Sequence, residues 1–105
     1  MYRTMLAVTA ALGAASLAAE SYQLSIESVR VEGSFIRSII RIDNRTPDEV
    51  GAFRVQCAYI DSQGRALAIE EAILPGALPR GISYGEVLGR NLPGIVDVQC
   101  RCRIN

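Results

Sequence analysis

Three cysteines, Cys57, Cys100 and Cys102, are the residues whose types and spacing most clearly indicate chemistry in this chain. All three fall on the apolar phase of predicted strands, and their odd number leaves one thiol over. A bridge from Cys57 to either of the others closes a loop of about 43 residues, worth about 4 kcal/mol. A Cys100–Cys102 bridge is worth only about 1.6 kcal/mol, and its Cα atoms lie about 6.5–7 Å apart on a strand, near the limit for bridging. Every long-range bridge therefore uses Cys57.

The direction of the strands separates the two possible partners of Cys57. If the last predicted strand runs antiparallel to the strand of Cys57, the later half of one meets the earlier half of the other, which favours Cys100. We therefore expect a Cys57–Cys100 disulfide and a spare buried thiol at Cys102. A Cys57–Cys102 disulfide is the alternative.

The pair Cys100 and Cys102 also has a functional interpretation. Two thiolates on one strand face can share a soft metal ion such as copper(I), or exchange disulfides. However, the chain has no histidine, and its two methionines are Met1 and Met5, so the mature protein would have to bind a metal through thiolates alone. In an oxidising compartment such thiolates tend to be oxidised to disulfides. We expect no metal and no cofactor.

The remaining residues do not indicate catalysis. Histidine is the usual general base, and its absence removes every mechanism that needs an imidazole. Glu70 and Glu71 are neighbours on a predicted strand, so they point to opposite faces and cannot share a proton as an acid–base dyad does. The sequence therefore predicts a protein that is not an enzyme.

The charges are balanced, with eleven arginines, no lysine and eleven acidic residues. A formal charge of zero argues against binding to nucleic acid or to an anionic membrane surface, because both need an excess of positive charge. Arginine stripes occur on two predicted strands, Arg37 with Arg41 and Arg101 with Arg103. We expect them to pair with acidic residues across the strands rather than to hold an acidic ligand.

The first 19 residues have the pattern of a secretory signal peptide. Arg3 precedes sixteen uncharged residues, Thr4 to Ala19, a run too short to span a bilayer. Ser16 and Ala18 are small residues of the kind that signal peptidase requires, so we expect cleavage after Ala18 or Ala19. Residues 1–19 are assigned to the signal peptide and 20–105 to the mature domain. We expect that domain in the periplasm or the medium of a bacterium, without a membrane anchor.

The mature chain has the pattern of β-strands, since apolar and polar residues alternate and no window keeps a helical period. The apolar residues of the first run change phase between Ile26 and Val29, which predicts a bulge at Glu27–Ser28. Later runs place their apolar residues on one face. In the last run this face carries Val96 and Ile104 at its two ends. The predicted strands are 23–32, 34–43, 52–60, 65–74, 82–88 and 95–104.

Turn-forming residues separate these runs. Thr46, Pro47 and Glu49 are expected to form one capped helical turn. Pro75 is expected to end the fourth strand because it cannot donate to a sheet ladder, so 75–81 is predicted to be a loop. Six or seven short strands at spacings of about ten residues predict an all-β fold, a small antiparallel immunoglobulin-like sandwich.

Three segments resemble the bacterial FxLYD-type β-sandwich domains. They are Ile42-Asp43-Asn44-Arg45-Thr46, the run 55–64 with its closing Asp61-Ser62-Gln63-Gly64, and Leu74-Pro75-Gly76. In that family, a strand ending in asparagine and threonine precedes a strand closed by an aspartate and glycine turn. The resemblance covers roughly residues 29–88, and the name-giving motif falls on 57–61, where Asp61 matches. It implies an envelope-associated interaction or accessory module with no assigned chemistry.

Two functions from different classes remain. The first is a non-enzymatic secreted or periplasmic module that binds a protein partner through a sheet edge or through residues 75–94, because loops carry binding more readily than buried faces do. The alternative is a thiol-based redox partner or soft-metal carrier that uses Cys100 and Cys102. The sequence specifies neither the partner nor the oligomeric state.

Overall fold

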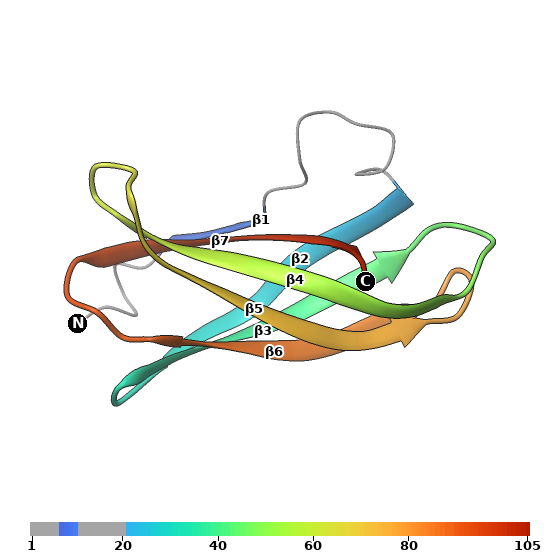
Figure 1. The fold of residues 1–105 in the computed structure, drawn as a ribbon, viewed down its shortest axis with the longest axis horizontal. Helices are drawn as coiled ribbons and strands as arrows, with labels where there is room; N and C mark the ends of the chain where they lie inside the picture. The colour runs from blue at the N-terminus through green and yellow to red at the C-terminus, as the bar shows by residue number, and fades with distance from the viewer. Residues whose placement is uncertain (1–6, 11–20) are drawn as a thin grey trace.

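The computed structural model describes residues 7–10 and 21–105, whose strands form two sheets (Figure 1). One sheet has the order β1-β7-β4-β5 and the other has the order β2-β3-β6. Neighbouring strands are antiparallel except β1 and β7. The predicted all-β immunoglobulin-like sandwich is confirmed. The strands are β1 (Ala7–Ala10), β2 (Tyr22–Glu32), β3 (Phe35–Asn44), β4 (Val50–Asp61), β5 (Ala66–Ala77), β6 (Ile82–Arg90) and β7 (Ile95–Ile104).

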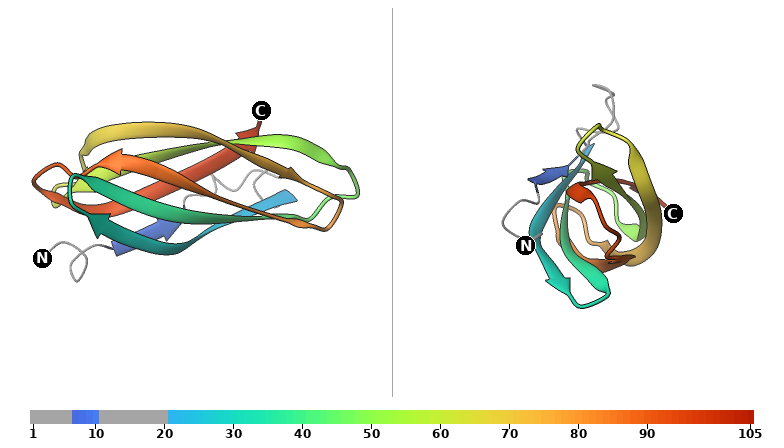
Figure 2. Two further views of the ribbon diagram at one scale, coloured as in Figure 1. Left: turned by 90° about the horizontal axis from the view of Figure 1, so that it is seen from below. Right: turned by 90° about the vertical axis from the view of Figure 1, so that its left-hand side faces the viewer.

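The two sheets curve around a shared interior, as the end-on view shows (Figure 2). β5 and β6 are edge strands of different sheets, yet they lie side by side and close one flank of the sandwich. β4 has a partner on each side in its own sheet, so it is central there, and β3 is central in the other. The two strands with the most regular alternation thus occupy the middle of each layer.

β1 belongs to the segment that the sequence assigns to the signal peptide. It runs parallel to β7, with Ala7 opposite Asp97 and Ala10 opposite Cys100. The predicted cleavage positions, after Ala18 or Ala19, lie outside the described residues. If the signal peptide is removed, the mature sandwich consists of the six strands β2 to β7.

The core is formed by the apolar faces that the alternation predicts. On β4, Phe53, Val55, Cys57 and Tyr59 are completely buried, and Arg54, Gln56 and Ala58 alternate with them on the outer face. β3 follows the same rule, because its isoleucines at every second position are buried while its arginines are half-exposed. This alternation is what a sheet with one dry face requires. The fully buried isoleucines of β3 are Ile36, Ile40 and Ile42.

The predicted bulge in β2 is confirmed. The register with β3 shifts between Ile26 and Ser28, so Glu27 is the extra residue. The extra residue brings both apolar phases of β2 to the same side. As a result, Ile26 before the bulge and Val29 after it both pack against the core.

The face of β7 differs from the prediction at its two ends. The register with β4 shifts between Ile60 and Asp61, so that Ile95 rather than Val96 faces the interior, where it is 1% exposed. At the other end, Ile104 lies opposite the buried Phe53, on the predicted side of the sheet, but it is 51% exposed. The prediction that Val96 belongs to the inner face was therefore wrong, Ile104 keeps the predicted phase without being buried, and Val98 and Cys100 are buried as expected.

Pro75 does not end its strand. β5 continues to Ala77, with Pro75 opposite Ala52 and Ala77 opposite Val50 in the ladder with β4. The predicted loop 75–81 therefore shortens to the connection after Ala77. Proline is tolerated here because β5 is an edge strand, and a residue that donates no hydrogen bond is permitted on the side without a ladder.

The predicted helical turn at Thr46–Glu49 was also wrong, because the buried Asn44 organises that segment as a bend. The Asn44 side-chain oxygen accepts hydrogen bonds from the backbone N–H and the hydroxyl of Thr46, at 3.0 and 2.7 Å. Its amide donates to the carbonyl oxygens of Asp48 and Leu78, at 2.8 and 3.1 Å. A side chain that satisfies two chain segments at once competes successfully with a helical cap.

Glycines of β6 make room for large side chains from the opposite sheet. The Tyr59 ring lies against Gly89, where an added Cβ would stand 2.3 Å from the ring carbon Cζ. Burial raises the pKa of the Tyr59 hydroxyl to about 12, so this group stays protonated at neutral pH. The position of Tyr59 therefore depends on the absence of a side chain at position 89.

Replacing Gly89 with alanine should destabilise the sandwich by about 1–3 kcal/mol, the usual cost of overpacking a core. The matched control is Gly51→Ala on β4, where an added Cβ meets no atom within 4 Å, so this variant should unfold at the urea midpoint of the parent protein or slightly above it. Urea unfolding of both variants measures the difference. Equal midpoints for the two variants would show that Tyr59 does not pack against Gly89.

Candidate functional site

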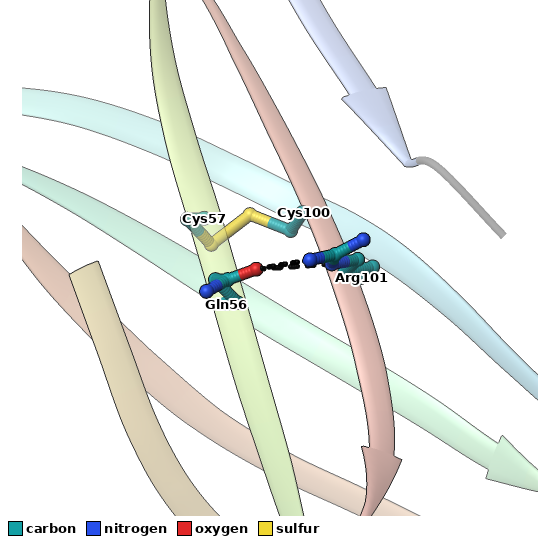
Figure 3. Close-up of a disulfide and its surroundings, with 4 residues drawn as sticks. All are labelled: Gln56, Cys57, Cys100 and Arg101. Carbon is teal, nitrogen blue, oxygen red and sulfur yellow. Dashed lines mark hydrogen bonds between the residues drawn. A yellow bond between two sulfur atoms is a disulfide. The ribbon is translucent and has the colours of Figure 1, made fainter. Parts of the chain in front are cut away.

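The disulfide joins Cys57 of β4 to Cys100 of β7, two residues that lie directly opposite each other in the ladder (Figure 3). Their Cα atoms are 4.1 Å apart, and 43 positions separate them in the sequence. This is the partner that the strand-direction argument favours. Both cysteines are buried on the inner face, with 0% and 1% exposure.

The bridge lies within one sheet. In antibody domains the disulfide crosses the core and ties one sheet to the other. Here it ties two neighbouring strands, β4 and β7, and thereby fixes which residues of the two strands are opposite each other. The two sheets are connected by packing of the apolar core and by side-chain hydrogen bonds, such as the one that the Ser83 hydroxyl of β6 donates to the carbonyl oxygen of Pro75 on β5.

Cys102 carries the free thiol and lies two residues beyond the bridge, opposite Val55. Its side chain is half-buried, and this burial raises the pKa of the thiol to about 11. A thiol with such a pKa is almost entirely protonated at neutral pH and is therefore a poor nucleophile and a poor metal ligand. Within residues 7–10 and 21–105, no group of three or more histidine, cysteine, aspartate or glutamate residues could hold a metal ion.

The outer face of the same sheet carries a chain of polar contacts. The Arg101 guanidinium donates from Nε and a terminal nitrogen to the side-chain oxygen of Gln56, at 3.0 and 2.7 Å (Figure 3). The amide of Gln56 donates to Glu71 of β5 at 3.3 Å, and Arg54 forms an ion pair with the same carboxylate at 3.0 Å. Arg54 also donates to the side chain of Asn105 at 3.0 Å. These contacts connect β7, β4 and β5 across the solvent side.

A hollow of about 340 Å³ lies on this face. Three arginines and one glutamate are its charged residues, and one of those arginines, Arg103, makes no ion pair or hydrogen bond through its side chain in the described structure. The hollow therefore combines a local excess of positive charge with room for a small molecule. Its lining residues are Arg54, Gln56, Glu71, Arg101, Cys102 and Arg103, and below we call it the arginine hollow.

The expectation that the arginine stripes pair with acidic residues across the strands holds for Arg37, whereas Arg41 pairs with an aspartate of its own strand and the stripe on β7 forms no ion pair in the described structure. Arg37 forms ion pairs with Glu32 and Glu86 on the two neighbouring strands, and Arg41 forms one with Asp43 at 3.1 Å. On β7, by contrast, Arg101 contacts the neutral Gln56 and Arg103 has no ion pair. The single glutamate of the arginine hollow is taken by Arg54.

Sequence reasoning missed Arg54 as a neighbour of Arg103, although a signal for it was present. Arg54 lies three residues before Cys57, and Arg103 lies three residues after Cys100. In an antiparallel ladder that places the two cysteines opposite each other, the two arginines must also be opposite each other, as the structure has them. The predicted disulfide was therefore sufficient to place Arg54 opposite Arg103.

Comparisons with known proteins add information on the fold. No family model matches the chain, and no curated protein sequence does. A solved structure of IrmA from Escherichia coli is similar to the chain with a TM-score of 0.57 and 12% sequence identity, over 75% of this chain and 71% of that one. At this level of identity the similarity supports the all-β fold alone. No helix in the part of the chain that the structure describes is long and apolar enough to cross a membrane.

Replacing Cys57 with serine should destabilise the protein far more than replacing Cys102 with alanine. Cys57→Ser removes a bridge worth up to about 4 kcal/mol and places a hydroxyl in the dry core. Cys102→Ala removes only a half-buried thiol that behaves as a small apolar group. Urea unfolding without reductant measures both variants. If both variants lose the same stability, the bridge does not stabilise the fold.

The Cys102 thiol should react slowly with alkylating reagents until the pH is high. With a pKa of about 11 it is about one part in a thousand thiolate at pH 8, whereas an ordinary cysteine is about one quarter thiolate there. The measurement is the rate of iodoacetamide labelling of the native protein against pH, with urea-unfolded protein as the control. If native and unfolded protein are labelled at the same rate at pH 8, the Cys102 thiol is accessible and its pKa is not raised.

Proposed function

We propose that this protein is a non-enzymatic secreted or periplasmic module that binds a protein partner. The observation that carries the proposal is a set of exposed large apolar side chains on β5 and β6, the two edge strands that lie side by side. Three residues from each strand contribute, and each is between 39% and 57% exposed. We call this set the β5–β6 apolar surface. It consists of Leu67, Ile69, Ile73, Ile82, Tyr84 and Leu88.

Alternation explains why these side chains face solvent. On β5, Ala68 and Ala72 pack against the core, so the larger residue that follows each of them, Ile69 and Ile73, points outward. On β6, the inner positions hold Ser83, Gly85, Val87 and Gly89, and the larger residues again alternate with them. Apart from the buried Leu74 and Val87, these strands therefore place small residues inside and larger apolar residues outside, the reverse of the usual arrangement in a half-exposed strand.

An exposed apolar surface of this kind favours a binding role. Single exposed apolar residues are common, but a group of them on neighbouring elements marks an interaction surface. Binding was expected at a sheet edge or within residues 75–94, and β6 meets both descriptions because it is an edge strand inside that range. A partner with its own apolar strand or helix face fits this surface.

The proposed location rests on three observations. The buried disulfide is compatible with an oxidising compartment outside the cytoplasm. The first 19 residues have a signal-peptide pattern, and the resemblance to FxLYD-type domains points to the bacterial envelope. The thiol-based alternative has less support. Cys100 is part of the disulfide and has no free thiol, and the raised pKa of Cys102 keeps its thiol protonated.

A photo-crosslinking residue placed at Ile69 or Tyr84 should form an adduct of one defined mass in intact cells, because both positions lie on the β5–β6 apolar surface. Position Arg30 is exposed on β2, the edge strand of the β2-β3-β6 sheet that lies farthest from β6, and as the matched control it should give none. The adduct should disappear when Leu88→Asp is added, since a carboxylate is costly to bury in an apolar contact. Intact mass of the same material reports whether Met1 has been removed.

Two results would count against the proposal. One is the absence of any adduct from Ile69 and Tyr84, and the other is an equal adduct from position Arg30. An adduct of twice the mass of the chain would identify the partner as a second copy.

A further inference from the structure

The most unusual feature of the outer face of the β1-β7-β4-β5 sheet is the direct opposition of two arginines. Arg54 on β4 and Arg103 on β7 are register partners, and Arg101 follows on the same face two residues away. Like charges directly opposite each other across a ladder are destabilising. Three arginines on one face therefore repel one another unless negative charge lies nearby.

The other sheet contains the same opposition and neutralises it. There Arg30 on β2 is the register partner of Arg37 on β3. Glu32 lies 3.8 Å from Arg30 and 3.3 Å from Arg37, and Glu86 forms a further ion pair with Arg37. Two arginines thus share two carboxylates, and the charge of that pair is balanced within the protein.

In the arginine hollow the balance is incomplete. Glu71 is its one acidic residue, and Arg54 already pairs with it. Arg101 donates both of its hydrogen bonds to the uncharged Gln56, and Arg103 makes no side-chain hydrogen bond or ion pair in the described structure. About two positive charges therefore remain without a counter-charge, although the whole chain has a formal charge of zero.

We propose that the arginine hollow binds a small oxyanion with at least two negative charges, in which phosphate, sulfate or carboxylate groups contact Arg101 and Arg103. A guanidinium presents parallel N–H donors that match two oxygens of such a group, which is why arginine is favoured for this recognition. The hollow of about 340 Å³ has room for a molecule of this size. The hollow borders the β5–β6 apolar surface, because its Glu71 lies on β5 between Ile69 and Ile73, but the proposed anion binding does not depend on a partner there.

The contacts of Arg101 and Arg54 set their positions for binding. Gln56 holds the Arg101 guanidinium through two of its donors, and Glu71 holds Arg54 through an ion pair. Groups that are held before the ligand arrives lose less conformational freedom on binding. The Arg103 side chain has no such partner, so its conformation becomes fixed only when the anion binds. Arg103 should therefore contribute to affinity mainly through its charge.

The test is isothermal titration of the processed protein with inorganic pyrophosphate at low salt, repeated with citrate. We expect saturable binding of at least one of these probes, weakened by added sodium chloride because exposed charges are screened. Arg103→Gln and Arg101→Gln should each raise the dissociation constant about tenfold, the effect of losing one charge-assisted contact. The control Arg30→Gln makes the same charge change on the other sheet and should leave the dissociation constant within about twofold of the parent value.

Two further readouts separate binding from a purely structural role. Without anion, Arg103→Gln should unfold at the same urea midpoint as the parent protein or higher, because it relieves the opposition to Arg54. With saturating probe, the parent midpoint should rise and the Arg103→Gln midpoint should rise less. Similar affinity for both probes defines a general oxyanion site, and a preference for one names its class as phosphate or carboxylate.

The proposal is overturned if neither pyrophosphate nor citrate binds the parent protein at about 10 mM, which is weaker than the millimolar affinity that one or two charge-assisted contacts provide. It is also overturned if Arg30→Gln weakens binding as much as Arg103→Gln does. That result would mean that the probe responds to total charge and does not occupy the arginine hollow.

Discussion

The antiparallel pairing of β4 with β7, held by the Cys57–Cys100 bridge, is the constraint on which the rest of this structure depends. A cross-link between two directly opposed residues permits one register, and in a ladder one register determines every other pair. On the inner side it places Cys102 opposite Val55, which leaves the spare thiol half-buried. On the outer side it brings Gln56 opposite Arg101 and assembles the arginine hollow.

The two faces of this strand pair have different tasks. The inner face is dry and supplies Tyr59, which reaches the opposite sheet because Gly89 leaves space for its ring. The outer face is polar and connects three strands through hydrogen bonds to Gln56 and Glu71. The β5–β6 apolar surface lies along the flank where the two sheets meet and adjoins the outer face at β5, because Ile73 is the register partner of Arg54. The molecule therefore offers two adjoining surfaces, one apolar and one positively charged.

Alternation was sufficient to predict much of the fold from the sequence. It assigned the inner faces of β3 and β4, and the phase change in β2 located the bulge at Glu27. These inferences succeed because burial on one side imposes a period of two on every strand. The same reasoning, with strand direction added, favoured Cys100 as the partner of Cys57.

The remaining features depend on contacts that a local pattern does not contain. Pro75 continues β5 because that strand is an edge, which only the order of strands reveals. The bend after β3 follows from a buried Asn44 that contacts a segment more than thirty residues away. Ile95 faces inward because of a bulge shared with β4. The arginine hollow joins residues of three strands, so it follows from pairing rather than from any one run of residues.

The measurement that tests this account most directly is a map of the disulfide in the processed protein. The protein is unfolded without reductant, its free thiols are alkylated, and the peptides are identified by mass spectrometry. The account predicts one alkylated thiol per chain, at Cys102, and one linked pair of peptides that contain Cys57 and Cys100. A Cys57–Cys102 link would contradict it, because the register would move by two residues and place Arg103 opposite Gln56. Three alkylated thiols would contradict it as well, since the β4–β7 register would then have no covalent constraint.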